Sequence, residues 1–240
     1  MNPPSLPVAG ESRPSVSAGL TGVFNVFIDP AATAKAVRAP LAWLWPLLIA
    51  GIVRIIFGWL SVPIMIDILS KNPPNGLSGE QLERAITISN TMYRVGAVAS
   101  PLLIAGWTAL VAALIMLVYS VVGVRAKFRD IFSLVSACAL ISMIHSIAAF
   151  FVIQAKAGEL QSFQQLSPPF GLDILFSDLK GPLYAILNFF SIFEIWYLVI
   201  LIFGLSYLTG SSRGKAFIAA TPSWLLGLLG AIIGSLFART

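Results

Sequence analysis

The sequence from Pro182 to Leu208 reads PLYAILNFFSIFEIWYLVILIFGLSYL, a run long and apolar enough to cross a lipid bilayer. One charged residue, Glu194, lies near its middle. A carboxylate in the hydrocarbon region is costly, so it requires either a partner or a function. The run therefore indicates a membrane-spanning helix with a candidate site inside it.

The whole chain has the composition of an integral membrane protein. Of its 240 residues, 58% are hydrophobic and 10% are charged, and the mean hydropathy is +0.89; soluble domains carry about 25% charged residues. Residues 1–17 are rich in Pro and Ser and lack the apolar core of a cleavable signal, so we expect a disordered cytoplasmic tail. Cys138, the single cysteine, lies in an apolar run and is expected to be a buried, inert thiol.

The apolar runs predict an all-α polytopic membrane protein whose transmembrane domain, residues 40–238, is a bundle of five helices. Short amphipathic helices are expected at the N-terminus and over about 79–99, in the first outer loop, with Ser100 as N-cap of the second span. The expected spans cover about 41–69, 101–123, 131–153, 183–208 and 216–238.

Residues 18–39 form an amphipathic interfacial segment in this interpretation. Asp29-Pro30 is a typical helix start, with the N-cap followed by proline at the first helical position. The segment either lies in the cytoplasmic headgroup layer or packs against the inner mouth of the bundle, and its sequence fits both arrangements.

The distribution of basic residues predicts the orientation in the membrane. Those on the side of the N-terminus lie in short segments, so the positive-inside rule places that terminus in the cytoplasm and the C-terminus on the opposite side. Basic residues without interleaved aromatics do not indicate a nucleic-acid platform. The expected cytoplasmic basic surface comprises Lys35, Arg38, Arg125, Lys127, Arg129, Arg213 and Lys215.

Three polar residues form a candidate intramembrane cluster: Arg54, Glu194 and His145. Arg54 lies near the middle of the first span, at the depth of Glu194, which predicts an ion pair that selects which helices pack together. A substrate, ion or proton pathway is the alternative. His145 is expected to be a satisfied core histidine or a relay with Glu194, and its neighbours lack the ligand spacing of a metal site.

Small residues predict close helix packing. Gly51 and Gly58 lie on the face of Arg54, and the fifth span carries Gly227, Gly230 and Gly234 along one side. The partner of that fifth-span side is either an internal helix or a second chain.

Several motifs resemble the bacterial branch of the Yip family of five-span membrane proteins. They are Asp29-Pro30, the run Asn188 to Trp196 (NFFSIFEIW), Gly204-Leu205-Ser206 and Lys215-Ala216. The resemblance covers about Leu20 to Ile233 and implies a cytoplasmic N-terminus. Eukaryotic members are implicated in binding Rab-type GTPases, so GTPase binding is implied by family analogy alone.

No motif indicates catalysis, since HExxH, GxSxG and paired intramembrane aspartates are all missing. We therefore expect no cofactor and a non-enzymatic protein. The resemblance to the bacterial branch implies a location in the bacterial inner membrane. The protein would act as an adaptor, scaffold or membrane-organising partner of other membrane proteins, or form a homo-oligomer. The alternative is a transporter or channel subunit that uses Arg54, Glu194 and His145.

Overall fold

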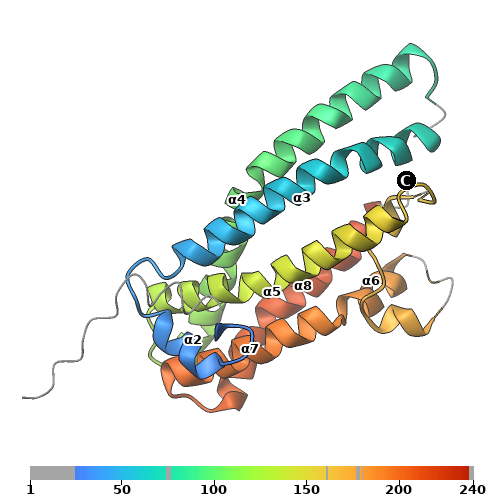
Figure 1. Cartoon of the computed structure of the whole chain (residues 1–240). Coiled ribbons are helices and arrows are strands. Elements are labelled where there is room, and N and C mark those ends of the chain that lie inside the picture. The colour runs from blue at the N-terminus through green and yellow to red at the C-terminus, as the bar shows by residue number, and fades with distance from the viewer. Residues whose placement is uncertain (1–24, 74–76, 161, 177–178, 180, 238–240) are drawn as a thin grey trace, which may run out of the picture.

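Figure 1 shows the chain as a computed structural model; it describes residues 25–73, 77–160, 162–176, 179 and 181–237. All secondary structure in these ranges is helical. In chain order the elements are α2 (Pro30–Ala36), α3 (Leu44–Lys71), α4 (Glu80–Val121), α5 (Phe128–Ala155), the 3-10 turns η2 (Phe163–Leu166) and η3 (Leu172–Leu175), α6 (Pro182–Phe189), α7 (Ile192–Thr209) and α8 (Arg213–Phe237).

Five helices are long and apolar enough to cross a membrane: α3, α4, α5, α7 and α8. The prediction of an all-helical, five-span membrane protein is therefore confirmed. The first span begins slightly later than expected, because Leu41 has a φ of 56° and the chain turns before Leu44. The fifth begins earlier, at Arg213.

The N-terminal segment packs on the bundle. The predicted tail, residues 1–17, and the first part of the predicted interfacial segment, residues 18–24, lie outside the described residues. Helix α2 contacts α7 and α5, and Val26 and Val37 are buried. The Asp29 carboxylate accepts a hydrogen bond from Ala32 N at 2.9 Å and caps α2, with Pro30 at its first position.

The predicted separation between an outer-loop helix and the second span is wrong. Residues 80–121 form one continuous helix of 42 residues, with Pro101 in its interior. Ser100 is not an N-cap; its hydroxyl donates to Ala97 O at 2.7 Å. The proline ring lies against Gly51 of α3, where an added Cβ would be 3.0 Å from Pro101 Cβ. Tertiary packing of this kind allows proline inside a membrane helix.

The fourth span was predicted as one helix over 183–208, and this is also wrong. Helix α6 ends at Phe189, and α7 begins at Ile192. Ser191 forms the N-cap of α7, since its hydroxyl accepts a hydrogen bond from Glu194 N at 3.2 Å. The span is therefore discontinuous in its middle.

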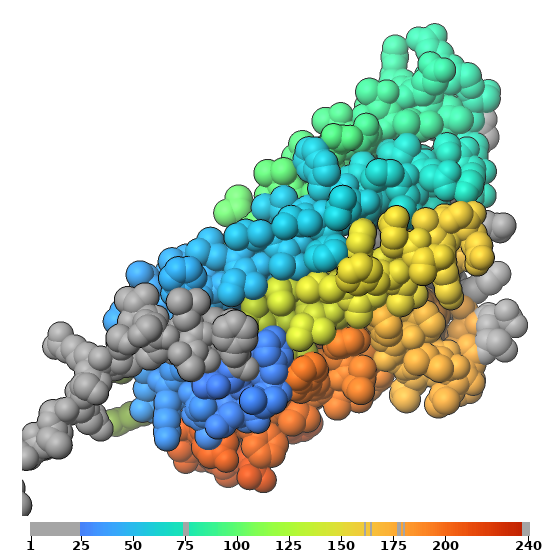
Figure 2. All heavy atoms as spheres, in the orientation of Figure 1, coloured from blue at the N-terminus to red at the C-terminus, as the bar shows by residue number. Residues whose placement is uncertain are grey.

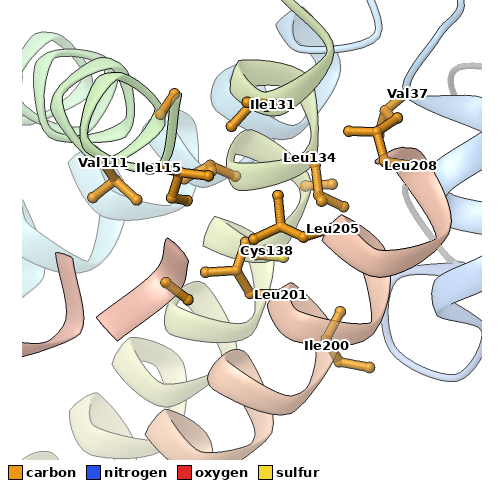
Figure 3. Close-up of a cluster of buried hydrophobic side chains, with 14 of the residues drawn as sticks. Val37, Val111, Ile115, Ile131, Leu134, Cys138, Ile200, Leu201, Leu205 and Leu208 are labelled. Carbon is orange, nitrogen blue, oxygen red and sulfur yellow. The ribbon is translucent and has the colours of Figure 1, made fainter. Parts of the chain in front are cut away.

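The hydrophobic core lies at the end of the bundle near α2, where α4, α5, α7 and α8 meet. Figure 3 shows Ile115, Leu134, Cys138 and Leu205 from three of these helices pointing toward one another. Cys138 is fully buried, as expected. Gly204 allows the closest approach here, because a Cβ would lie 2.7 Å from a methyl carbon of Leu134.

At the opposite end a smaller core joins the loop end of α3 to the end of α5, where Ile64 and Ile68 pack against Ile153 and Leu160. The first half of α4 lies on the side of α3 that faces away from α5, as Figures 1 and 2 show. None of the residues of α4 before Ala97 is buried. We call residues 80–96 the outer arm of α4.

Candidate functional site

A cavity of about 430 Å³ lies among the five spans and α6. Its wall is largely apolar, with Ala139 and Met143 from α5 and Phe189 from α6. Two ionisable side chains also line it, Arg54 of α3 and Glu194 of α7. The hydroxyl-bearing residues in the wall are Ser100, Thr108, Ser142, Ser146, Tyr197 and Ser223.

Arg54 is bound to α5. Its Nη1 donates a hydrogen bond to Ser146 Oγ at 2.8 Å, and that hydroxyl donates to Ser142 O at 3.0 Å. The expected ion pair between Arg54 and Glu194 does not form: the ion pairs among the described residues are Lys71–Asp67, Arg84–Glu80 and Arg129–Asp130. Arg54 and Glu194 share a cavity, but not a bond.

The break in the fourth span places Glu194. The residue lies in the first turn of α7, where the partial positive charge of a helix N-terminus favours a carboxylate. Its backbone N–H is bonded to Ser191, while within the described residues no hydrogen bond or ion pair includes its carboxylate. The sequence contained the signal for this break, since Ser191 and Glu194 have the spacing of a capping box.

His145 does not line the cavity. Its ring stacks on Phe193 at a centroid distance of 5.0 Å and meets Phe170 edge-on at 5.4 Å. These contacts place the imidazole in an aromatic cluster beside the helix break. The structure thus brings Arg54 and Glu194 together at one cavity, and His145 is not among the residues that line it.

Trp224 is a site residue that the sequence analysis missed. It lines the cavity from α8, and its ring lies 5.3 Å from the rings of both Phe189 and Phe190. Its Nε1 atom is enclosed and has no hydrogen-bond partner in the structure. Nothing in the sequence distinguishes this tryptophan from one that anchors a span at the membrane interface.

The predicted packing glycines lie in different surroundings. Gly51 faces Pro101, and an added Cβ at Gly58 would lie 3.1 Å from Ala97 Cβ, so both are in the α3–α4 contact. An added Cβ at Gly227 would lie 3.4 Å from a carbon of the Phe189 ring. An added Cβ at Gly230 or Gly234 would meet nothing within 4 Å, so that part of α8 faces away from the chain's own described helices.

Four residues of the expected basic surface surround a second cleft of about 440 Å³, together with Asp130: Arg38, Arg125, Lys127 and Arg129. Arg38 Nη2 donates to Leu208 O at 3.0 Å, and Arg129 Nη2 donates to Arg38 O at 3.0 Å. Of the other three, Arg213 lies over the Phe203 ring at 4.3 Å, and Lys35 and Lys215 are exposed.

Comparison with known proteins identifies the family. The chain matches the Yip1 domain over residues 24–234. The chain belongs to the Yip1 family. A relative, membrane protein YknW of Bacillus subtilis (strain 168), is 32% identical over 226 residues, which cover 90% of this chain and 89% of that protein. No solved structure matches the chain.

Membership in the Yip1 family confirms the resemblance found in the sequence and establishes an integral membrane protein. One of the motifs on which the resemblance was based, Asn188 to Trp196, includes the break between α6 and α7 and contains Glu194. In the part of the chain that the structure describes, no group of three or more His, Cys, Asp or Glu residues is arranged to hold a metal ion.

Proposed function

We propose that this Yip1-family chain is a non-enzymatic adaptor that binds another membrane protein along α4. The observation that supports this is an apolar stripe on the outer arm, formed by Ile88, Met92 and Val95. Their exposed fractions are 54%, 67% and 61%. Successive members of the stripe are three or four residues apart, so they lie on one side of the helix.

The length and composition of α4 support a position of this stripe beyond the lipid. At about 1.5 Å per residue the helix is about 63 Å long, roughly twice the ~30 Å hydrocarbon core, so part of it lies outside that core. The outer arm is the charged part of the helix, with Glu80, Glu83, Arg84 and Arg94. Acyl chains therefore do not cover Ile88, Met92 and Val95, and such a stripe in an aqueous region is typical of a protein-binding surface.

The same side of α4 continues into the bilayer at Leu102, which is 78% exposed. A partner helix that crosses the membrane and extends beyond it on the outer side would contact the whole stripe. This continuity favours another membrane protein over a soluble one.

Site-specific photocrosslinking in native membranes tests the adaptor proposal. A photoreactive amino acid at Met92 should yield an adduct with one other membrane protein, identified by mass spectrometry. The same substitution at Glu83, which is exposed and lies about 180° around the helix from Met92, is the matched control and should yield none. Equal adducts from both positions, or no adduct from Met92, would contradict the proposal. An adduct with a second copy of this chain would also contradict the adaptor role and would indicate a homo-oligomer instead.

We also propose that the chain resides in a bacterial inner membrane with a cytoplasmic N-terminus and its C-terminus on the opposite side. The clustering of Arg38, Arg125, Lys127 and Arg129 at one end of the bundle supports this orientation. Alkaline phosphatase fused after residue 240 should be active, and the same enzyme fused after Gly123 should be inactive. The reverse pattern would contradict the orientation.

A second candidate function, a transporter or channel subunit, is favoured by the cavity that contains Arg54 and Glu194. A transport route must become accessible to water from both sides of the membrane. Ser142→Cys, in the cavity wall, should then react with a membrane-impermeant thiol reagent added to either side, whereas Ser133→Cys in the core should not react. The native Cys138 is fully buried and gives a low background. If Ser142→Cys reacted with reagent added to only one side, or to neither side, this function would be excluded.

A further inference from the structure

We propose that the cavity lined by Arg54, Glu194 and Trp224 binds an amphiphile whose head group carries both an ammonium and a phosphate. This inference goes beyond the adaptor role and does not depend on it, because the outer arm and the cavity share no residue named in either proposal. It would also define the substrate class of the transporter candidate.

The polar groups of the cavity are incompletely paired. Among the described residues Arg54 makes one hydrogen bond, to Ser146, which leaves other guanidinium N–H groups available. The Trp224 ring also lines the cavity, but its Nε1 atom is fully enclosed and does not face the cavity space. The charged donors of Arg54 favour an anion with several acceptor oxygens, as in a phosphate.

Glu194 supplies the opposite preference. Among the described residues its carboxylate has no hydrogen bond or ion pair, although it lines the same cavity as Arg54. Unpaired ionisable groups inside a membrane bundle are costly, and such residues mark ligand or ion sites. An ammonium group within hydrogen-bonding distance would satisfy the carboxylate. A ligand with an ammonium and a phosphate would therefore match the Glu194 carboxylate and the Arg54 guanidinium.

The volume fits a head group better than a single ion. Water occupies about 30 Å³ per molecule in the liquid, so a cavity of about 430 Å³ holds on the order of ten waters. Small-molecule sites in proteins have volumes of about 300–1,000 Å³. The cavity lies within this range.

The mouth of the cavity favours an amphiphile. Leu103 and Trp107 of α4 belong to the cavity wall and are also 69% and 46% exposed on the outside of the bundle. The cavity thus reaches the surface beside apolar side chains within the membrane-spanning part of α4. A ligand whose acyl chains remain in the bilayer would enter there without removing those chains from lipid.

Binding of a short-chain zwitterionic phospholipid tests the proposal. The purified full chain in detergent is titrated with dihexanoyl phosphatidylethanolamine, and binding is measured by native mass spectrometry and by the shift in thermal midpoint. Two comparison ligands separate the sources of affinity. Dihexanoyl phosphatidylglycerol keeps the chains and phosphate but lacks the ammonium, and O-phosphoethanolamine keeps the head group but lacks the chains.

We expect saturable binding of the phosphatidylethanolamine, with affinity at least about tenfold higher than for either comparison ligand. Equal affinity for the phosphatidylglycerol would overturn the zwitterionic head group, and equal affinity for O-phosphoethanolamine would overturn the amphiphile. Absence of saturable binding would overturn the site itself.

Variants place the binding in this cavity. Glu194→Gln and Arg54→Gln should each weaken phosphatidylethanolamine binding about tenfold. Glu83→Gln and Arg84→Gln on the outer arm are matched controls and should bind as the native chain does. Arg54→Gln keeps a side-chain donor for Ser146, so it decides the outcome if Glu194→Gln does not fold. Unchanged binding in Arg54→Gln would overturn the assignment. The adaptor proposal is tested at Met92 and fails or succeeds separately.

Discussion

Arg54 of α3 donates a hydrogen bond to Ser146 of α5 at 2.8 Å, although Glu194 lines the same cavity. A serine hydroxyl leaves the guanidinium formally charged and only partly paired. The contact joins two helices and keeps donors of Arg54 available to the cavity. Structural and binding roles of Arg54 can therefore be tested separately.

The first prediction concerns Ser146. Ser146→Ala should destabilise the bundle by about 0.6–2 kcal/mol, because interhelical hydrogen bonds in membranes contribute about 0.6 and at most about 1.7 kcal/mol, and charged donors lie toward the upper end. Thermal unfolding in detergent measures the change. Ser120→Ala is the control, since that exposed hydroxyl bonds only Leu117 O of its own helix. Equal effects of the two substitutions would mean that the Arg54 contact adds no stability.

The second prediction concerns the α3–α4 contact. Gly51→Ala should destabilise the chain by about 1–3 kcal/mol, because the new methyl group would lie 3.0 Å and 3.2 Å from two carbons of the rigid Pro101 ring, which cannot rotate away. Gly106→Ala in α4 should be neutral or stabilising by up to about 1 kcal/mol, since nothing lies within 4 Å of its added Cβ. Thermal unfolding of the two variants side by side tests the contact, and a neutral Gly51→Ala would refute it.

Periodicity and hydropathy were sufficient to predict the five spans, because any bilayer-crossing helix needs a long apolar run. They could not predict where helices continue or stop. Pro101 suggested a boundary, but packing against Gly51 keeps α4 continuous. Conversely, the apolar run around Ser191 suggested continuity, but a local cap divides it. Local hydrogen bonding and helix contacts, and not hydropathy, determine these boundaries.

The candidate site was predicted in part. Depth along each span placed Arg54 and Glu194 at one level, and both line the same cavity. Depth does not give the direction in which a side chain points around its helix. For this reason the predicted ion pair between Arg54 and Glu194 was wrong, and His145, which does not line the cavity, was assigned to the same cluster. Trp224 could not be found at all, because only the three-dimensional structure reveals that its indole N–H is enclosed and unpartnered.

The third prediction concerns the cap that divides the fourth span. Ser191→Ala removes the acceptor for Glu194 N and should cost about 1 kcal/mol, the usual cost of losing an N-cap. Ser191→Asn, which retains a side-chain acceptor, should recover part of that stability. Hydrogen exchange of the amides of residues 192–194 measures the local effect. Exchange rates that do not change in Ser191→Ala would show that the first turn of α7 does not depend on this cap.

The last prediction concerns the attachment of α2 to the bundle. Arg38 follows α2 and donates to Leu208 O near the end of α7, while Arg129 at the start of α5 donates to Arg38 O. Arg38→Gln removes the charged donor to Leu208, so α2 should separate from α7 more often and residues 30–37 should exchange amide hydrogens faster by about tenfold, as expected for the loss of about 1.4 kcal/mol. Lys35→Gln removes an exposed charge from the same helix without a bonded partner among the described residues, and its exchange should match that of the native chain. Faster exchange in both variants would mean that positive charge near the membrane surface, and not the Arg38–Leu208 hydrogen bond, holds α2 in place.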